Sequence, residues 1–141
     1  MIGCMRPIAL AAILLATACA GLEPSTSSLA CPEGFRPGVL AEAYFGRAVA
    51  GRANVSDAEW AVFAASELTR RFPGGFSVSE VAGQWRGADG LIVRESTKRV
   101  SLVLTEPDRQ RPDLNEAAEA FRTRFAQDSV LLTETPVCVR F

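Results

Sequence analysis

The stretch "FSVSEVAGQWRGADGLIVRESTKRVSLVLT", residues 76–105, has the pattern of two β-strands joined by a short turn. Residues 76–85 and 91–105 carry β-branched and apolar residues in loose alternation with polar ones, and the Gly-Ala-Asp-Gly segment at 87–90 favours a hairpin turn. The polar run at 96–98 predicts a β-bulge in the second strand. An antiparallel hairpin therefore occupies the middle of the chain.

The residues before this hairpin predict an amphipathic helix that begins after Ser56. Ser56 and Glu59 form a capping-box pair, and Val55 can pack against Trp60 as a hydrophobic staple. The Pro-Gly-Gly segment at 73–75 ends the helix. Its apolar stripe comprises Trp60, Phe63, Ala64, Leu68 and Phe72.

A second helix is predicted after the hairpin, behind a proline-bounded loop at 107–112. Asp113 and Glu116 supply the expected cap. Its inward stripe comprises Leu114, Ala117, Ala118, Phe121 and Phe125. Strands are predicted at 39–48 and 130–141, and Pro136 places the last of these at a sheet edge, because proline cannot donate to the ladder of a central strand.

The element order is therefore βαββαβ over a single α+β domain at 39–141. We expect the ferredoxin-like plan, in which two helices cover one face of a four-stranded antiparallel sheet with strand order 4-1-3-2. In this order the last strand lies beside the first. Cys138 should then lie close to the segment that precedes the first strand, which contains Cys31.

The first 18 residues have the pattern of a secretory signal peptide: a short basic start, an apolar run, and small residues before Cys19. Residues 15–19 resemble a bacterial lipobox, which predicts lipidation of Cys19, with palmitate among the acyl groups, and a membrane-anchored lipoprotein of the cell envelope. Cleavage after Ala18 or Ala20 is the alternative and would give a soluble secreted or periplasmic protein. Residues 19–38 are expected to be a flexible spacer.

The four cysteines have different expected fates. Cys4 leaves with the signal peptide, and a lipidated Cys19 leaves Cys31 and Cys138 as an even pair in an oxidising compartment. A disulfide between those two is then the default expectation. A free Cys19 would leave one thiol over.

Composition excludes several classes of function. The chain has 15 basic and 16 acidic residues, so it offers no basic surface of the kind that binds nucleic acid. It contains no histidine, which removes the commonest general base and the commonest metal ligand. We expect no metal and no cofactor.

The hairpin and the first strand carry the candidate binding residues. They are Tyr44, Arg47, Gln84, Trp85, Arg86, Glu95 and Lys98. In the binding hypothesis Trp85 and Tyr44 form an aromatic platform. Arg86 and Arg94 then bind a carboxylate or a partner protein through their guanidinium groups. In the enzyme hypothesis, a hydrolase or isomerase uses Glu95 as acid or base with Arg86 and Lys98 as anion partners. The third interpretation is a structural hairpin with cross-strand ion pairs.

The register of the hairpin separates these interpretations. A four-residue loop at 87–90 pairs Arg86 with Leu91 and gathers Gln84, Arg86 and Glu95 on one face. Pairing of Arg86 with Gly90 instead moves Glu95 to the side of Trp85. Only the first register builds a polar cluster.

Six segments resemble a family of small exported bacterial proteins known as domain of unknown function 3574, in order over residues 40–141. They are "AYFGR" (43–47), "VSDAEWAVF" (55–63), "TRRFPGGFSV" (69–78), "GQWRG" (83–87), "IVRESTKRV" (92–100) and "SVLLTETPVCVRF" (129–141). The resemblance implies an exported, often lipid-anchored, single-domain protein and brings no activity with it. The working expectation is a ligand- or partner-binding lipoprotein, and the uncovered sheet face offers a surface for a homodimer.

Overall fold

The computed structural model describes residues 30–51, 53–87 and 89–141; the predicted signal peptide and Cys19 lie outside them. The strands are β1 (Arg36–Gly46), β2 (Ser77–Arg86), β3 (Ile92–Leu104) and β4 (Leu131–Val139). The helices are α1 (Asp57–Phe63), its π-helical continuation η1 (Ala64–Thr69), and α2 (Pro107–Phe125). No helix in these ranges is long and apolar enough to cross a membrane.

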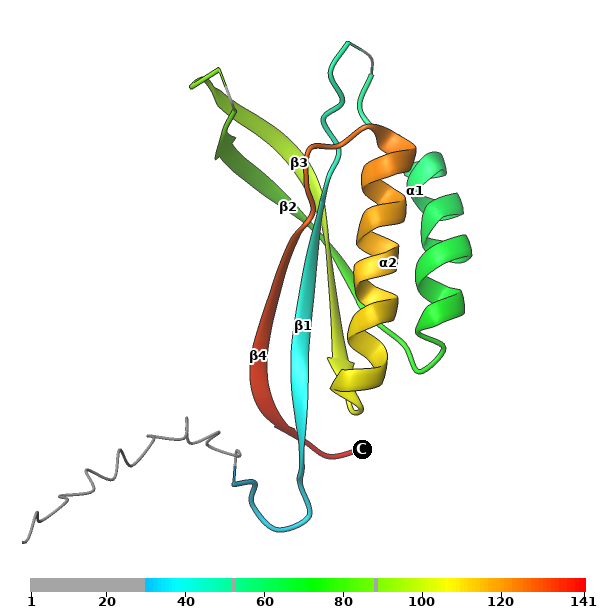
Figure 1. The fold of residues 1–141 in the computed structure, drawn as a ribbon, viewed down its shortest axis with the longest axis vertical. Helices are drawn as coiled ribbons and strands as arrows, with labels where there is room; N and C mark the ends of the chain where they lie inside the picture. The colour runs from blue at the N-terminus through cyan, green and yellow to red at the C-terminus, as the bar shows by residue number, and fades with distance from the viewer. Residues whose placement is uncertain (1–29, 52, 88) are drawn as a thin grey trace, which may run out of the picture.

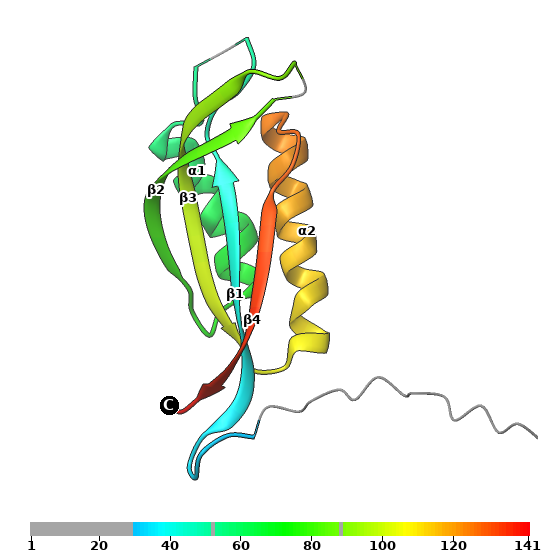
Figure 2. The ribbon, with the colours of Figure 1, turned by 90° about the vertical axis from the view of Figure 1, so that its left-hand side faces the viewer.

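The four strands form one antiparallel sheet in the order β2-β3-β1-β4, which confirms the predicted fold class and strand order. Both helices lie on the same side of the sheet, and the β2–β3 hairpin extends beyond them at one end (Figure 1). The view turned by 90° shows the other side of the sheet, which no described helix covers (Figure 2). Pro136 lies in the edge strand β4, as its missing N–H requires.

The hydrophobic core fills the space between the helices and the sheet. Its centre is a set of aromatic rings in which Phe45 of β1 lies 4.9 Å from Phe121 of α2 and 5.6 Å from Phe63 of α1, measured between ring centroids. These three side chains are fully buried. Edge-to-face and tilted contacts of this kind add to the free energy of burial.

The first helix begins as predicted, because Ser56 and Glu59 form both hydrogen bonds of the capping box. The predicted stripe is almost entirely buried, and Ala64 is partly buried. Phe63 and Leu68 are five residues apart, which a regular α-helix would turn to different sides. The π-helical segment η1, with its wider turn, lets both side chains reach the core.

The start predicted for the second helix was wrong. α2 begins at Pro107, so the expected loop at 107–112 is helical and Asp113 is not its cap. Pro107 suits the first helical position, and the Glu106 carbonyl accepts from the N–H groups of Arg109 and Gln110. Pro112 removes only the hydrogen bond to the Asp108 carbonyl, close to an exposed helix end.

The predicted β-bulge in the third strand was also wrong. β2 and β3 pair without interruption from Ser77↔Ser101 to Arg86↔Ile92. The polar run at 96–98 causes no break because its side chains have places on both faces: Thr97 is buried on one, and Lys98 forms ion pairs on the other.

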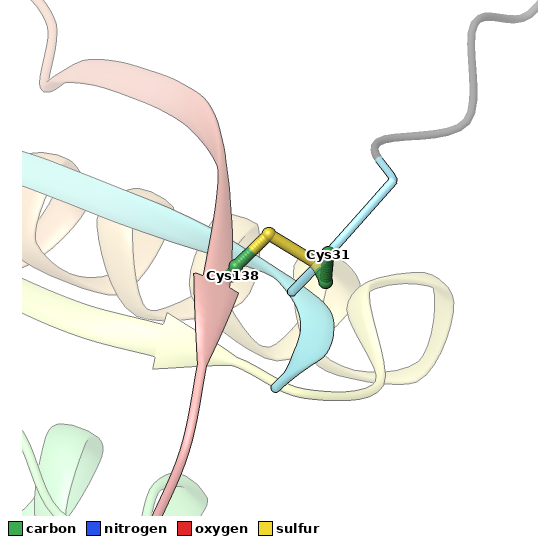
Figure 3. The surroundings of a disulfide bond; sticks show 2 residues. All are labelled: Cys31 and Cys138. Carbon is green, nitrogen blue, oxygen red and sulfur yellow. A yellow bond between two sulfur atoms is a disulfide. The ribbon is translucent and has the colours of Figure 1, made fainter. Parts of the chain in front are cut away.

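A disulfide joins Cys31 to Cys138, as predicted (Figure 3). Their Cα atoms are 5.5 Å apart, within the normal range for such a bond. β1 begins at Arg36, earlier than expected, so the last three residues of the predicted spacer belong to the sheet. The bond joins the segment that precedes β1 to the end of β4.

Candidate functional site

Glu95 of β3 lies on the uncovered face of the sheet, between two glycines. Gly83 of β2 is its cross-strand partner. Gly46 of β1 pairs with Thr97, which lies two residues after Glu95 on the same face of β3. A Cβ atom on Gly46 would lie only 2.6 Å from Oε2 of Glu95, and one on Gly83 would lie 2.8 Å from Oγ1 of Thr97. The carboxylate therefore occupies space that any other residue at position 46 would fill.

Two donors fix the orientation of this carboxylate. The backbone N–H of Ala48 donates to Oε2 over 3.0 Å, and the indole Nε1–H of Trp85 donates to Oε1 over 2.9 Å. An ionised carboxylate has about four acceptor positions, so each oxygen keeps capacity for a further donor. Glu95 is therefore held in one orientation, and its carboxylate can still accept hydrogen bonds from a ligand.

A cavity of about 330 Å³ opens above Glu95. This volume is at the small end of the range for small-molecule sites. Its lining residues come from β1, β2, β3, the segment between α2 and β4, and the start of β4; they are Tyr44, Gly46, Val81, Ala82, Gly83, Gln84, Trp85, Glu95, Thr97, Gln127, Asp128, Ser129 and Leu131. Trp85 is 42% exposed, so its ring is accessible to a ligand.

The segment after α2 forms one wall of the cavity. Ala126 adopts a left-handed conformation with φ +50°, and the N–H of Gln127 donates to the carbonyl of Arg122, which ends the helix. The side-chain amide of Gln127 donates to the Ala48 carbonyl over 2.7 Å. Ala48 therefore connects this wall to Glu95, because its N–H and its carbonyl bind one partner each.

A separate group of charges lies on the opposite side of the hairpin. Glu80 of β2 accepts from Arg47 over 2.8 Å and from Lys98 over 2.9 Å. Asp57 lies 3.1 Å from each of those two cations. The Ser96 hydroxyl and, after it, the Lys98 ammonium lower the pKa of Glu80 to about 2. The pKa of Lys98 is raised, chiefly by its hydrogen bond to Glu80.

The predicted site residues thus divide into three groups. Tyr44, Gln84, Trp85 and Glu95 line the cavity. Arg47 and Lys98 belong to the ion-pair group with Glu80 and Asp57. Arg86 donates to the Gly90 carbonyl over 2.7 Å and closes the hairpin turn.

Neither register considered from the sequence is the one observed. Arg86 pairs with Ile92 across a five-residue connection, which places Glu95 opposite Gly83 and on the face of Trp85. The polar cluster of Gln84, Arg86 and Glu95 on one face is not formed. The turn is longer than expected because Asp89 accepts from the Leu91 N–H, and the Gly87 N–H donates to the Leu91 carbonyl.

Sequence reasoning missed the two glycines and the wall of the cavity. Gly46 and Gly83 stand inside predicted strands, where a glycine signals close approach of another group, and this signal was available. Thr97, only 5% exposed, was assigned to a bulge instead of the cavity floor. Gln127 had no local signal, since its role depends on the position of Ala48.

The described residues form a small α+β protein of the ferredoxin-like plan, with a carboxylate at the floor of a cavity on its uncovered sheet face. The chain belongs to the family described as Protein of unknown function (DUF3574), whose model matches residues 41–141. No curated protein matches it.

Two solved structures of a phage SAM lyase share the fold. The complex with S-methyl-5'-thioadenosine has a TM-score of 0.56 at 15% identity, and the match covers 74% of this chain and 90% of the lyase. The apo lyase has a TM-score of 0.54 at 16% identity, over 82% and 97% of the two chains. At this level of identity the likeness shows the fold alone.

Proposed function

We propose that this protein is an exported, lipid-anchored domain that binds a small molecule in the cavity above Glu95. One observation carries the proposal. The Glu95 carboxylate rests against the backbone of Gly46, is oriented by Ala48 and Trp85, and keeps free acceptor capacity toward the cavity. A carboxylate used only in a structural ion pair would need none of this arrangement.

The lining of the cavity indicates the chemistry of the ligand. Trp85, Tyr44 and Leu131 offer flat or apolar surface, which suits a small aromatic body. Glu95 accepts hydrogen bonds and carries negative charge, so the ligand should present an N–H, an O–H or a cationic group to it. The proposed ligand class is therefore a small aromatic compound with a donor group, such as a nucleoside.

The fold neighbours supply a first probe. The phage SAM lyase was solved in complex with S-methyl-5'-thioadenosine, a compound that combines an aromatic base with hydroxyl and amino donors. Its chemistry is of the class that the lining of this cavity suits. It is therefore the compound with which binding should be tested first.

Isothermal titration of the purified protein with S-methyl-5'-thioadenosine tests the proposal. We expect saturable binding that weakens about tenfold or more in Glu95→Gln, because an amide presents an N–H to one of the two donors that hold the carboxylate. Glu116→Gln is the matched control, because Glu116 lies on α2 and does not line the cavity. Equal affinity of both variants, or no binding by the wild type, would count against the proposal.

The proposed anchor is tested separately. The apolar run and the small residues before Cys19 support lipidation there. After a high-salt wash, which removes proteins held only by charge, Cys19→Ser should be found in the soluble fraction and the wild type in the membrane fraction. Unchanged membrane partitioning of the variant would contradict the anchor, and an intact mass that lacks the lipid would favour ordinary signal-peptide cleavage.

The sequence also suggested a hydrolase or isomerase that combines Glu95 with Arg86 and Lys98. The register puts Glu95 on one face of the hairpin and the other two side chains in different hydrogen-bonded groups. Nothing in the cavity favours that arrangement, so binding is the function that the geometry supports best.

A further inference from the structure

Two exposed phenylalanines and two arginines gather at the end of the molecule that holds the disulfide. They are Phe35, Arg36, Arg140 and Phe141, and we call them the Phe-Arg patch. Phe35 is 39% exposed and Phe141 is 87% exposed. The first described residues and the C-terminal residues lie together at this lower end of the molecule (Figure 1).

The arginines of the patch are held beside its aromatic rings. The guanidinium of Arg140 lies 4.9 Å from the ring centroid of Phe35, and that of Arg36 lies 5.6 Å from the ring of Phe141. These are cation–π distances. Within the described residues, neither arginine forms an ion pair, unlike Arg111 and Arg122 on α2. The positive charge of the patch is therefore available to a partner.

The disulfide holds the Phe-Arg patch close to the first residues of the domain. The disulfide joins Cys31 to Cys138, which is two residues before Arg140. Cys19 precedes Cys31 by twelve residues, and a chain of that length spans at most about 40 Å. A lipid on Cys19 would therefore keep the patch within reach of a bilayer surface.

We propose that the Phe-Arg patch docks on the headgroup region of an anionic phospholipid bilayer. Exposed phenylalanine rings can enter the boundary between headgroups and acyl chains, and arginine is attracted to anionic headgroups. The choice of a bilayer as partner rests on the anchor proposed at Cys19. Because the anchor holds the domain close to the surface, even a weak patch would be occupied through its high effective concentration.

Docking at this patch would also orient the ligand cavity. Arg36 and Gly46 are at opposite ends of β1, a strand of eleven residues that is about 35 Å long at the usual rise per residue. The patch lies at the first end and the cavity at the second. The docked domain would present its cavity away from the bilayer.

Vesicle sedimentation of the unlipidated Cys19→Ser protein tests this proposal apart from the anchor. Vesicles of phosphatidylglycerol with phosphatidylethanolamine should bind the protein at low salt, and vesicles of phosphatidylcholine should bind it much less. Arg36→Gln/Arg140→Gln should lower partitioning about tenfold. The control Arg94→Gln/Arg124→Gln removes the same charge at the other end of the molecule and should leave partitioning nearly unchanged.

A second variant guards against a folding defect. Phe141→Ser removes the most exposed ring of the patch, which contributes little to the core. It should also weaken binding while the melting temperature stays within a few degrees of wild type. All variants are compared in the Cys19→Ser background. The proposal is overturned if the Cys19→Ser parent does not bind anionic vesicles, if the control pair loses as much binding as the patch pair, or if neither patch variant binds less.

Discussion

The indole Nε1–H of Trp85 donates to Oε1 of Glu95 over 2.9 Å along a diagonal of the β2–β3 ladder. Trp85 pairs with Val93, and Glu95 pairs with Gly83, so the two side chains meet across positions that are not directly opposite. A diagonal contact of this kind is within reach of a large aromatic side chain. This contact can form because Gly83 has no side chain that would lie between Trp85 and Glu95.

The first prediction concerns the space beneath Glu95. Gly46→Ala places a methyl group 2.6 Å from the carboxylate and should displace it, with a loss of about 1 to 3 kcal/mol in the free energy of unfolding. Gly74→Ala is the matched control, because a Cβ there has no neighbour within 4 Å, and it should stay within about 0.5 kcal/mol. Urea denaturation measures both. Similar values for the two variants would show that Glu95 does not depend on the gap at Gly46.

The second prediction concerns the disulfide. Cys31→Ser/Cys138→Ser opens a loop with a sequence separation of 107 residues, and we expect a loss of about 3 to 5 kcal/mol. Reductant should lower the melting temperature of the wild type and leave the double variant unchanged. A wild-type protein whose stability is insensitive to reductant would show that the bond contributes little.

The third prediction concerns pH. The Ser96 hydroxyl and the Lys98 ammonium lower the pKa of Glu80 from 4.5 to about 2 in the folded protein. A lowered folded-state pKa means that the contribution of Glu80 is complete above pH 4.5 and is lost as the pH falls toward 2. The gap in melting temperature between wild type and Glu80→Gln should therefore be largest above pH 5 and should close near pH 2.

Thermal denaturation followed by circular dichroism across that range measures this gap. Glu33→Gln serves as the control, since Glu33 lies outside the ion-pair group of Glu80. A gap for Glu80→Gln that stays constant from pH 6 to pH 2 would contradict the assigned role of its partners.

The fourth prediction concerns the aromatic centre of the core. Phe121→Ala removes a fully buried ring that contacts Phe45, Phe63 and Phe125, and it should cost about 3 to 5 kcal/mol. Phe141→Ala removes a ring that is mostly exposed and should cost less than about 1 kcal/mol. Chemical denaturation distinguishes them. Equal losses of unfolding free energy in the two variants would contradict the assignment of Phe121 to the centre of the core.

The fold was predictable because its signals are local and repeated. The capping box at Ser56 and the apolar stripes predict where the helices lie along the chain. Pro136 places the last strand at an edge of the sheet, which fits the observed strand order. That order in turn brings Cys31 and Cys138 together. The start of α2 was less accessible, since proline at 107 and 112 suggests a loop unless the hydrogen bonds around Glu106 are known.

The candidate site was only partly predictable. Trp85, Glu95 and Tyr44 were identified by type, but the register that places them on one face depends on how the turn at 87–91 closes. A change of one residue in that connection moves every side chain to the other face. Glu95 and Lys98 were grouped in one site because a bulge was predicted between them; in the uninterrupted strand their spacing of three residues places them on opposite faces.

The most direct test of the central claim is a two-dimensional NMR titration that follows the indole Nε1–H signals. The chain has two tryptophans: Trp85 at the cavity and Trp60 in the core. Addition of S-methyl-5'-thioadenosine should shift the Trp85 signal in a saturable way, because the ligand contacts the ring or competes for Glu95, while the Trp60 signal stays in place. A Trp85 signal that remains unchanged up to millimolar ligand, or an equal shift of both signals, would contradict the account.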